Sequence, residues 1–264
     1  MPEYKNAAAA AKRIAHIASH VSASTRHSVE NAQNNILNGT GSPKGSAMSL
    51  SNHAEAMAMH SWFTENSLEA MRQWWFVAAN LDMLTYQYEV DTFAPGGYAL
   101  KLMKPLLSNN AALIERFSHY EAPFDAVYIE DPKENDYWAY QFMLALRGDW
   151  ARLSSRCDLV LAQPDIVEDS KYLIDHKFFK SLSSGDRDGM ETALTELVSP
   201  KAVKARSSDD SGYGADLIST AGVIHAKIAW LHGHQIKIDS PYIPAEWLPM
   251  DPLPFYKPQY SFFE

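Results

Sequence analysis

Apolar residues recur at helical spacing along most of the chain. Between residues 47 and 93 the larger ones return every three or four positions, which is typical of the buried face of a helix. Asn66 followed by Glu69 resembles a capping box, so we predict two helices that break near residues 64–67. Upstream, two shorter apolar series predict two more helices, at Ile14, Ile17 and Val21 and at Val29, Ala32, Ile36 and Leu37. The turn-forming residues 38–46 that follow predict a flexible loop.

Two later segments repeat one arrangement, in which an apolar helical run, a Gly-Asp pair and a second helical run follow one another. They are residues 137–165 and 175–200. The two glycines can adopt the left-handed conformation that closes a helix, and the two aspartates can cap the next one. Each segment therefore predicts an antiparallel helix hairpin, and the 37-residue offset (148 to 185) is typical of helical repeats. The four junction residues are Gly148, Asp149, Gly185 and Asp186.

Residues 215–232 predict the last long helix, and His232, Gly233 and His234 stand at its end. Gly233 has the same position relative to this helix as the junction glycines have to theirs, which gives it a structural role, and His232 would favour the helix dipole. The alternative is a metal site that also uses His225. We predict no metal site, because His225 lies on a different helical face from Leu231.

The remaining residues, 239–264, form a segment that we call the strap. Its six prolines, at 241, 244, 249, 252, 254 and 258, preclude a helix and favour an extended path. Such a segment can pack across its own bundle. Alternatively, Trp247, Phe255 and Tyr256 anchor a partner, since aromatic side chains dominate binding hot spots.

Together these elements predict an all-α protein, a repeat-like bundle of antiparallel helix hairpins closed by an extended C-terminal strap. We expect residues 1–264 to form a single domain in which the helices of residues 1–46 are peripheral. The only cysteine, Cys157, excludes an intramolecular disulfide and suits a reducing compartment. No secretory signal or long uncharged apolar stretch is present, so we expect a cytoplasmic protein with no membrane partner.

No pattern of catalytic residues supports an enzyme. The nucleophile elbow, the phosphate-binding loop and the HExxH zinc motif are absent from the sequence. Glu130, Asp131 and Lys133 resemble the carboxylate-lysine set of a nuclease. However, Pro132 and the lack of flanking strands remove the hairpin on which such a set is built. We expect no catalysis and no cofactor.

The net charge of −9 is concentrated in the acidic stretch, residues 121–170, where eleven acidic side chains stand against four basic ones. Such a surface repels nucleic acid and attracts a basic protein. We expect four carboxylates of this stretch to be exposed in a proline-containing connection, where they would contact a partner. The alternative is an ordinary solvated face that keeps the protein soluble. The four are Glu130, Asp131, Glu134 and Asp136.

Residues 224–249 contain a helix, a glycine, an extended Ile-Lys-Ile-Asp and a Pro-Tyr-Ile-Pro turn. In these features they resemble the immunity protein 49 family, and the two Gly-Asp junctions add to the resemblance. The similarity covers about residues 50–250. It implies an all-helical protein of bacterial polymorphic toxin or type VI secretion systems that neutralises a cognate toxin by binding it. A cytoplasmic inhibitor with an acidic field would suit a nuclease toxin with a basic surface. Two other hypotheses are a helical-repeat scaffold or regulator without a toxin, and a metal-dependent hydrolase built on histidines.

Overall fold

The computed structural model describes residues 4, 6–22, 25–88, 94–167 and 169–263. In these parts of the chain all regular secondary structure is helical and no strand occurs, which confirms the all-α prediction. Most of the buried apolar side chains form one continuous cluster. The single-domain assignment and the repeat relation between the hairpins stay predictions.

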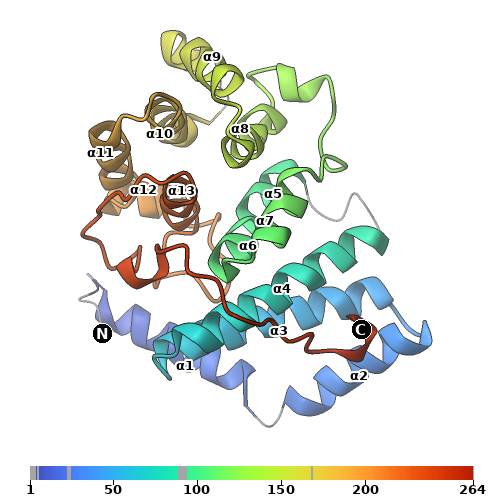
Figure 1. Ribbon diagram of the computed structural model, residues 1–264. Coiled ribbons are helices and arrows are strands. Elements are labelled where there is room, and N and C mark those ends of the chain that lie inside the picture. Colours follow the sequence, from blue (N-terminus) through green and yellow to red (C-terminus); the bar gives the residue numbers. More distant parts are fainter. Residues whose placement is uncertain (1–3, 5, 23–24, 89–93, 168, 264) are drawn as a thin grey trace.

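The N-terminal third is built around a pair of long antiparallel helices, α3 (Pro43–Phe63) and α4 (Leu68–Tyr88). They lie side by side in Figure 1 and are joined by a four-residue turn. Two shorter helices, α1 (Ala7–His20) and α2 (Arg26–Asn38), pack against α3. Helices therefore form in each of the four segments where the apolar spacing predicts them.

The predicted flexible loop at residues 38–46 is shorter than expected. α3 already begins at Pro43, and the Ser42 hydroxyl accepts a hydrogen bond from the Gly45 backbone amide at 3.1 Å. Proline is favourable in the first helical turn because its missing N–H would have no partner there. The prediction was wrong for residues 43–46, because a Ser-Pro pair can start a helix as well as interrupt one.

The predicted capping box at Asn66 and Glu69 was also wrong. Asn66 has a φ of +53°, a left-handed conformation that asparagine tolerates better than most residues. It belongs to the turn that ends α3. The cap of α4 is the next residue, Ser67, whose hydroxyl accepts a hydrogen bond from the Ala70 amide at 3.2 Å.

Three short helices occupy the middle of the molecule, where the sequence pattern predicted no element: α5 (Pro95–Lys101), α6 (Met103–Ser108) and α7 (Ala111–Ser118). Every residue of α6 is buried, and this helix packs against both α4 and α13 (Thr220–Leu231). It joins the N-terminal helix pair to the C-terminal half of the fold.

A buried ionic cluster fixes α6 to α3 and α4. The Lys104 ammonium lies 2.9 Å from the Asp82 carboxylate, 3.4 Å from Glu55 and 2.8 Å from the Ser51 hydroxyl. Burial alone would raise the pKa of Asp82, but the charges of Lys101 and Lys104 outweigh it and lower that pKa. The cluster is a structural feature, since its opposite charges offset one another.

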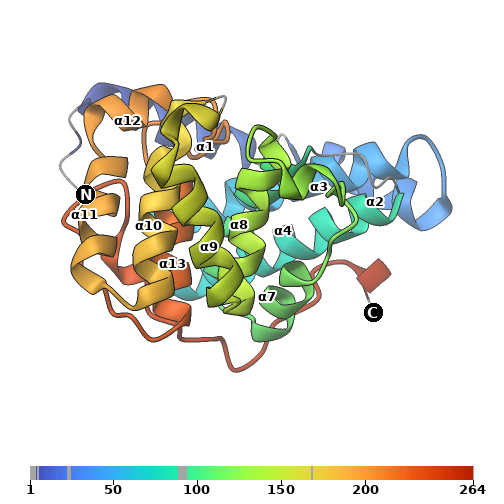
Figure 2. The same ribbon diagram turned by 90° about the horizontal axis from the view of Figure 1, so that it is seen from above.

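The two predicted hairpins are α8 (Asn135–Arg147) with α9 (Trp150–Ala162) and α10 (Leu173–Ser184) with α11 (Arg187–Leu197). Figure 2 shows the four helices side by side at one end of the molecule. The glycine at each junction has a φ of +71°. The aspartate after each glycine caps the next helix. Asp149 accepts a hydrogen bond from the Arg152 amide, and Asp186 accepts one from the Gly189 amide. These junction residues are Gly148, Asp149, Gly185 and Asp186.

The last long helix, α13 (Thr220–Leu231), begins five residues later than predicted, after the short α12 (Pro200–Ala205). Residues 215–217 belong to a turn, and the Ser219 hydroxyl caps α13 at the Gly222 amide, so the prediction of a helix from 215 was wrong. Nearly every side chain of α13 is buried. At its end Gly233 has a φ of +84°, so its backbone conformation, and not a lack of space, is what favours glycine there.

The strap leaves α13 and crosses the α3–α4 layer, as the red segment of Figure 1 shows. The Lys227 ammonium of α13 donates to the backbone carbonyls of Trp247 and Leu248 at 3.2 and 3.3 Å. Asn109 adds hydrogen bonds to the carbonyls of Pro249 and Asp251 at 3.1 and 3.0 Å. The strap is therefore held along its backbone by side chains of the bundle.

Candidate interaction surface

The connection between α7 and α8, residues 119–134, carries three of the four predicted partner-binding carboxylates, and the fourth lies just inside α8. Asp136 is 8 % exposed, and its carboxylate accepts a hydrogen bond from the Asp125 amide at 3.0 Å. The expectation that all four are exposed was therefore wrong for Asp136. α8 is buried from Asp136 to Leu146, and the Asp136 carboxylate holds the connection against the helix.

Glu130 is exposed but not free. It lies in the 3-10 helix η3 (Tyr128–Glu130), and its carboxylate pairs with Arg152 and, at 3.0 Å, with Arg156 of α9. The Arg156 guanidinium also lies over the Tyr137 ring, 3.7 Å from its centroid. Glu130 thus fastens η3 to the α8–α9 hairpin, and its charge is largely offset.

Asp131 and Glu134 are the members of the set that leave charge at the surface. Asp131 is partly exposed, and its carboxylate accepts a hydrogen bond from the Lys133 amide at 3.0 Å. Glu134 is exposed and precedes α8, but its side chain makes no capping hydrogen bond. Between them they are the acidic part of the connection that a partner could contact.

Nearby lysines reduce the acidic field further. Lys171 lies 3.1 Å from Asp169, and Lys180 lies 2.6 Å from Asp158. Both lysines follow the acidic stretch in sequence. With these two included, eleven acidic side chains face six basic ones, and the local net charge changes from −7 to −5. The surface stays acidic, but less so than the sequence stretch by itself indicates.

Two apolar side chains at the tip of the connection were not singled out in the sequence. Val127 is 72 % exposed and Tyr128 is 49 % exposed. Asp125 fixes the backbone beneath them, because its carboxylate accepts hydrogen bonds from both of their amides, at 2.7 and 3.2 Å. An exposed apolar pair on an ordered turn can bind a partner without first losing conformational entropy.

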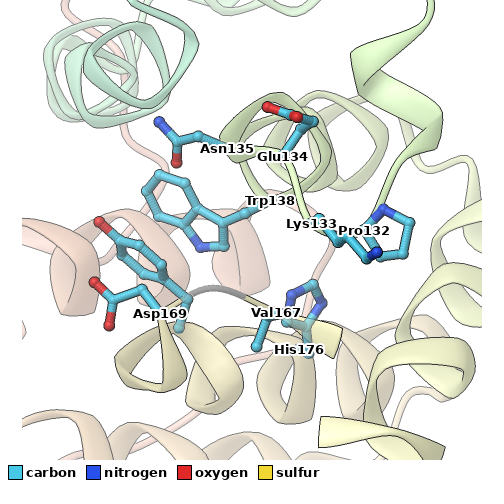
Figure 3. A pocket seen from close by; sticks show the side chains of 9 residues that line it. Pro132, Lys133, Glu134, Asn135, Trp138, Val167, Asp169 and His176 are labelled. Atoms are coloured by element: carbon cyan, nitrogen blue, oxygen red, sulfur yellow. The ribbon is translucent and has the colours of Figure 1, made fainter. Parts of the chain in front are cut away.

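A pocket of about 520 Å³ borders the connection. Figure 3 shows Trp138 on one side of it, Pro132 and Lys133 on the other, and Val167 and His176 beneath them. The Trp138 and Tyr172 rings stack with centroids 4.1 Å apart. The pocket brings together the end of the connection, the first turn of α8 and the start of α10. Its lining consists of Pro132, Lys133, Glu134, Asn135, Trp138, Val167, Asp169, Tyr172 and His176.

His176 is fully buried, and within the described residues neither of its ring nitrogens has a hydrogen-bond partner. Burial lowers the pKa of His176 to about 4, so the ring is neutral at pH 7. A buried polar group without a partner costs about 1–3 kcal/mol, and such groups are uncommon in native folds. The adjacent Asp175-His176 pair within an apolar helical run is the sequence signal that could have drawn attention to this position.

The wall behind the pocket is a buried charge network centred on Asp175. Trp138 donates its indole N–H to this carboxylate at 2.7 Å, and Arg206 donates to both carboxylate oxygens at 2.7 and 2.8 Å. His225 lies 3.1 Å away. Burial alone would raise the pKa of Asp175, but Arg206 and His225 outweigh it and lower that pKa far below its usual value. The network fixes the position of Trp138.

The three aromatic residues predicted as partner anchors on the strap have different environments. Trp247 is 1 % exposed and makes edge contacts with the rings of Trp62 and Phe63. The Tyr256 hydroxyl donates to the Ser108 carbonyl at 2.6 Å. Phe255 is 72 % exposed. The accessibility that a partner anchor needs is therefore present at Phe255 and absent at Trp247.

The histidines around Gly233 have structural contacts. The His232 ring hydrogen-bonds through Nε2 with the Ala145 carbonyl at 2.8 Å and contacts the edge of Trp150. His225 is buried beside Asp175. Across the described ranges no group of three or more His, Cys, Asp or Glu side chains could hold a metal ion. Burial raises the pKa of the Cys157 thiol to about 12, which makes it a poor nucleophile.

None of the helices in the described part of the chain is both long enough and apolar enough to cross a membrane.

In a comparison with known protein families, residues 158–247 match the family described as Immunity protein 49. This confirms the resemblance seen in the sequence, over a narrower segment than the expected residues 50–250. Comparison with curated proteins and with solved structures gave no match. The matched segment runs from within α9 to the end of η6 (Ala245–Trp247), so it includes His176 but not the connection.

Proposed function

We propose, taking the family match over residues 158–247 as the premise, that this chain is an immunity protein that binds and neutralises a cognate antibacterial toxin. That match is the observation that carries the proposal. The protein acts as a stoichiometric inhibitor and performs no turnover. An inhibitor that binds its toxin needs an accessible contact surface and no catalytic cleft. The preorganised connection, residues 119–134, is the surface that suits this role best.

The toxin that we propose is a nuclease acting in the cytoplasm, delivered by a polymorphic toxin or type VI secretion system. The net charge of −9 supports this choice. A nuclease binds phosphates through a basic surface, and an acidic inhibitor is attracted to the same surface. The immunity protein then resides in the cytoplasm, where its toxin acts, and makes no direct contact with nucleic acid.

The contact surface that we propose is the tip and acidic edge of the connection. Val127 and Tyr128 supply exposed apolar area, and Asp131 and Glu134 supply charge around it. Central apolar contacts contribute most of the binding free energy of an interface, whereas charges at its rim act mainly on the association rate. Glu130 and Asp136 support this surface from below, and Phe255 is the strap residue still available to a partner.

The test is co-expression of this chain with the protein encoded by the neighbouring reading frame in a sensitive bacterial host. We expect the neighbour alone to stop growth and degrade nucleic acid, and the pair to grow normally and to co-purify as a stoichiometric complex. An unfolded variant such as Trp75→Asp is the matched control. Growth arrest that persists despite a folded, expressed chain would reject the proposed function, and arrest without nucleic-acid damage would reject the nuclease assignment alone.

A further inference from the structure

The pocket beside the connection contains an unused hydrogen-bonding group. The His176 ring is fully buried at its floor, and among the described residues nothing hydrogen-bonds to either ring nitrogen. The neighbouring Tyr137 ring is tilted against the His176 ring, with centroids 6.3 Å apart, and the two rings share no hydrogen bond. A buried polar group without a partner at the floor of a pocket is an acceptor that an entering donor can satisfy.

The charges around the pocket favour a cationic occupant. Glu134 and Asp169 contribute carboxylates, and Lys133 contributes the opposing positive charge. The Asp169 side chain pairs with Lys171 but is still 46 % exposed, so it can accept a second donor. His176 is neutral because burial lowers its pKa to about 4, so its ring presents a lone pair and does not repel a cation.

The walls are already in place before anything binds. Trp138 is held by its hydrogen bond to Asp175 and by stacking on Tyr172. Tyr172 is backed in turn by the Arg206 guanidinium, 5.0 Å from the ring centroid. A preorganised pocket costs less conformational entropy on binding than one that must form. Lys133 is exposed, and a flexible exposed side chain is the part of the lining that an entering group can displace.

We propose that this pocket receives a basic side chain of the toxin, an arginine, whose guanidinium donates to a ring nitrogen of His176 and to the Glu134 carboxylate. The planar guanidinium carries five N–H donors and can satisfy several acceptors at once. The proposal rests on the function proposed above and adds the chemistry of one contact to it. The pocket lies partly inside the family-matched segment, which contributes Asp169, Tyr172 and His176.

The experiment compares two surface variants whose effects should have opposite signs. The partner is a purified, inactivated form of the toxin, identified as the protein whose growth inhibition this chain abolishes. Glu134→Gln removes an acceptor and a negative charge, and we expect the dissociation constant to rise about tenfold, chiefly through faster dissociation. Lys133→Gln removes a charge that repels the guanidinium, and we expect tighter binding. The matched controls are Glu246→Gln and Lys257→Gln, two exposed positions on the strap, which should leave binding unchanged.

A second measurement follows the His176 ring by NMR in the wild-type protein, so it does not depend on how well a variant folds. In the wild-type protein the His176 ring nitrogens should change their ¹⁵N chemical shifts on complex formation, and His176→Phe should bind less tightly while unfolding as cooperatively as the wild type. Tighter binding by Glu134→Gln together with weaker binding by Lys133→Gln would show an anionic occupant and overturn the proposal. Unchanged binding together with unchanged ring shifts would overturn it as well. A wild-type chain that fails to bind the toxin at all rejects the proposed function instead.

Discussion

The strap and the connection have similar compositions and opposite roles in the structure. Both are proline-containing segments with aromatic and acidic residues, and for each of them contact with a partner was one of two interpretations of the sequence. The strap packs against its own bundle, where Trp247 is buried between two rings of α3. The connection turns its apolar tip, Val127 and Tyr128, to solvent. The difference teaches that aromatic composition does not by itself identify a binding segment.

The two segments are fixed in different ways, and this explains the difference. The strap is held through its backbone carbonyls by Lys227 and Asn109, which draw the whole segment onto the bundle. The connection is held at its base by the side chains of Glu130 and Asp136, which leaves the tip free to project. A segment whose charged groups are satisfied at its base can expose apolar residues and stay ordered.

The largest effect should come from truncating the buried strap aromatic. Trp247→Ala removes a fully buried indole, and we expect the free energy of unfolding to fall by about 3–5 kcal/mol. The control is Phe255→Ala on the same strap, where an exposed ring is lost and the change should stay below about 0.5 kcal/mol. Denaturant unfolding monitored by circular dichroism measures both. Equal losses for the two variants would contradict the contrast between buried and exposed strap residues.

The lysine that holds the strap should make stability depend on pH. Burial, followed by the charge of Arg72, lowers the pKa of Lys227 from 10.5 to about 7. As the pH rises from about 7 toward 10, the unfolded chain still binds this proton and the folded chain has lost it, so stability increases. The gain is at most about 1.4 kcal/mol per pH unit. The measurement is the free energy of unfolding by denaturant at a series of pH values, and the Lys227→Met variant should lack this part of the increase. If stability changed with pH equally in the two proteins, the expectation would be refuted.

Removing the apolar tip of the connection should affect binding and leave the fold intact. For Val127→Ser combined with Tyr128→Ser, we expect the affinity for the toxin to fall about tenfold or more, since exposed apolar anchors dominate interfaces. The free energy of unfolding should change by less than about 0.5 kcal/mol, because neither side chain is buried. Calorimetric titration and thermal unfolding separate the two quantities. Normal affinity would place the interface on another part of the molecule.

The smallest effect should follow from neutralising a single rim charge. Asp131→Asn should slow association with the toxin about twofold at low salt and leave the dissociation rate nearly unchanged, because rim charges steer the encounter. The difference should disappear at high salt. Glu246→Gln, an exposed acid of the strap, is the matched control and should have no effect. Stopped-flow association at two salt concentrations measures both, and equal slowing by the two variants would mean that only the net charge matters.

Local sequence determined where the helices of the two hairpins end and begin. A glycine followed by aspartate closes one helix and caps the next through the conformations and hydrogen bonds of those two residues alone, so the junctions at 148–149 and 185–186 could be predicted. The apolar spacing likewise predicted the helix pair around Trp75. Prediction was less accurate where two local signals competed. Ser42 and Pro43 start α3 inside an expected loop, and Ser67 takes the capping position that was assigned to Asn66.

Contacts between distant residues decided the rest, because a side chain's environment depends on segments far away in the chain. Trp247 and Phe255 stand eight positions apart in one strap, yet the first packs against rings of α3 and the second lies in solvent. Four neighbouring carboxylates read alike in the sequence. In the fold, arginines of α9 pair with Glu130, and Asp136 is buried against the connection, so Asp131 and Glu134 keep the exposed charge. The pocket over His176 likewise exists only because α8, α10 and the connection meet there.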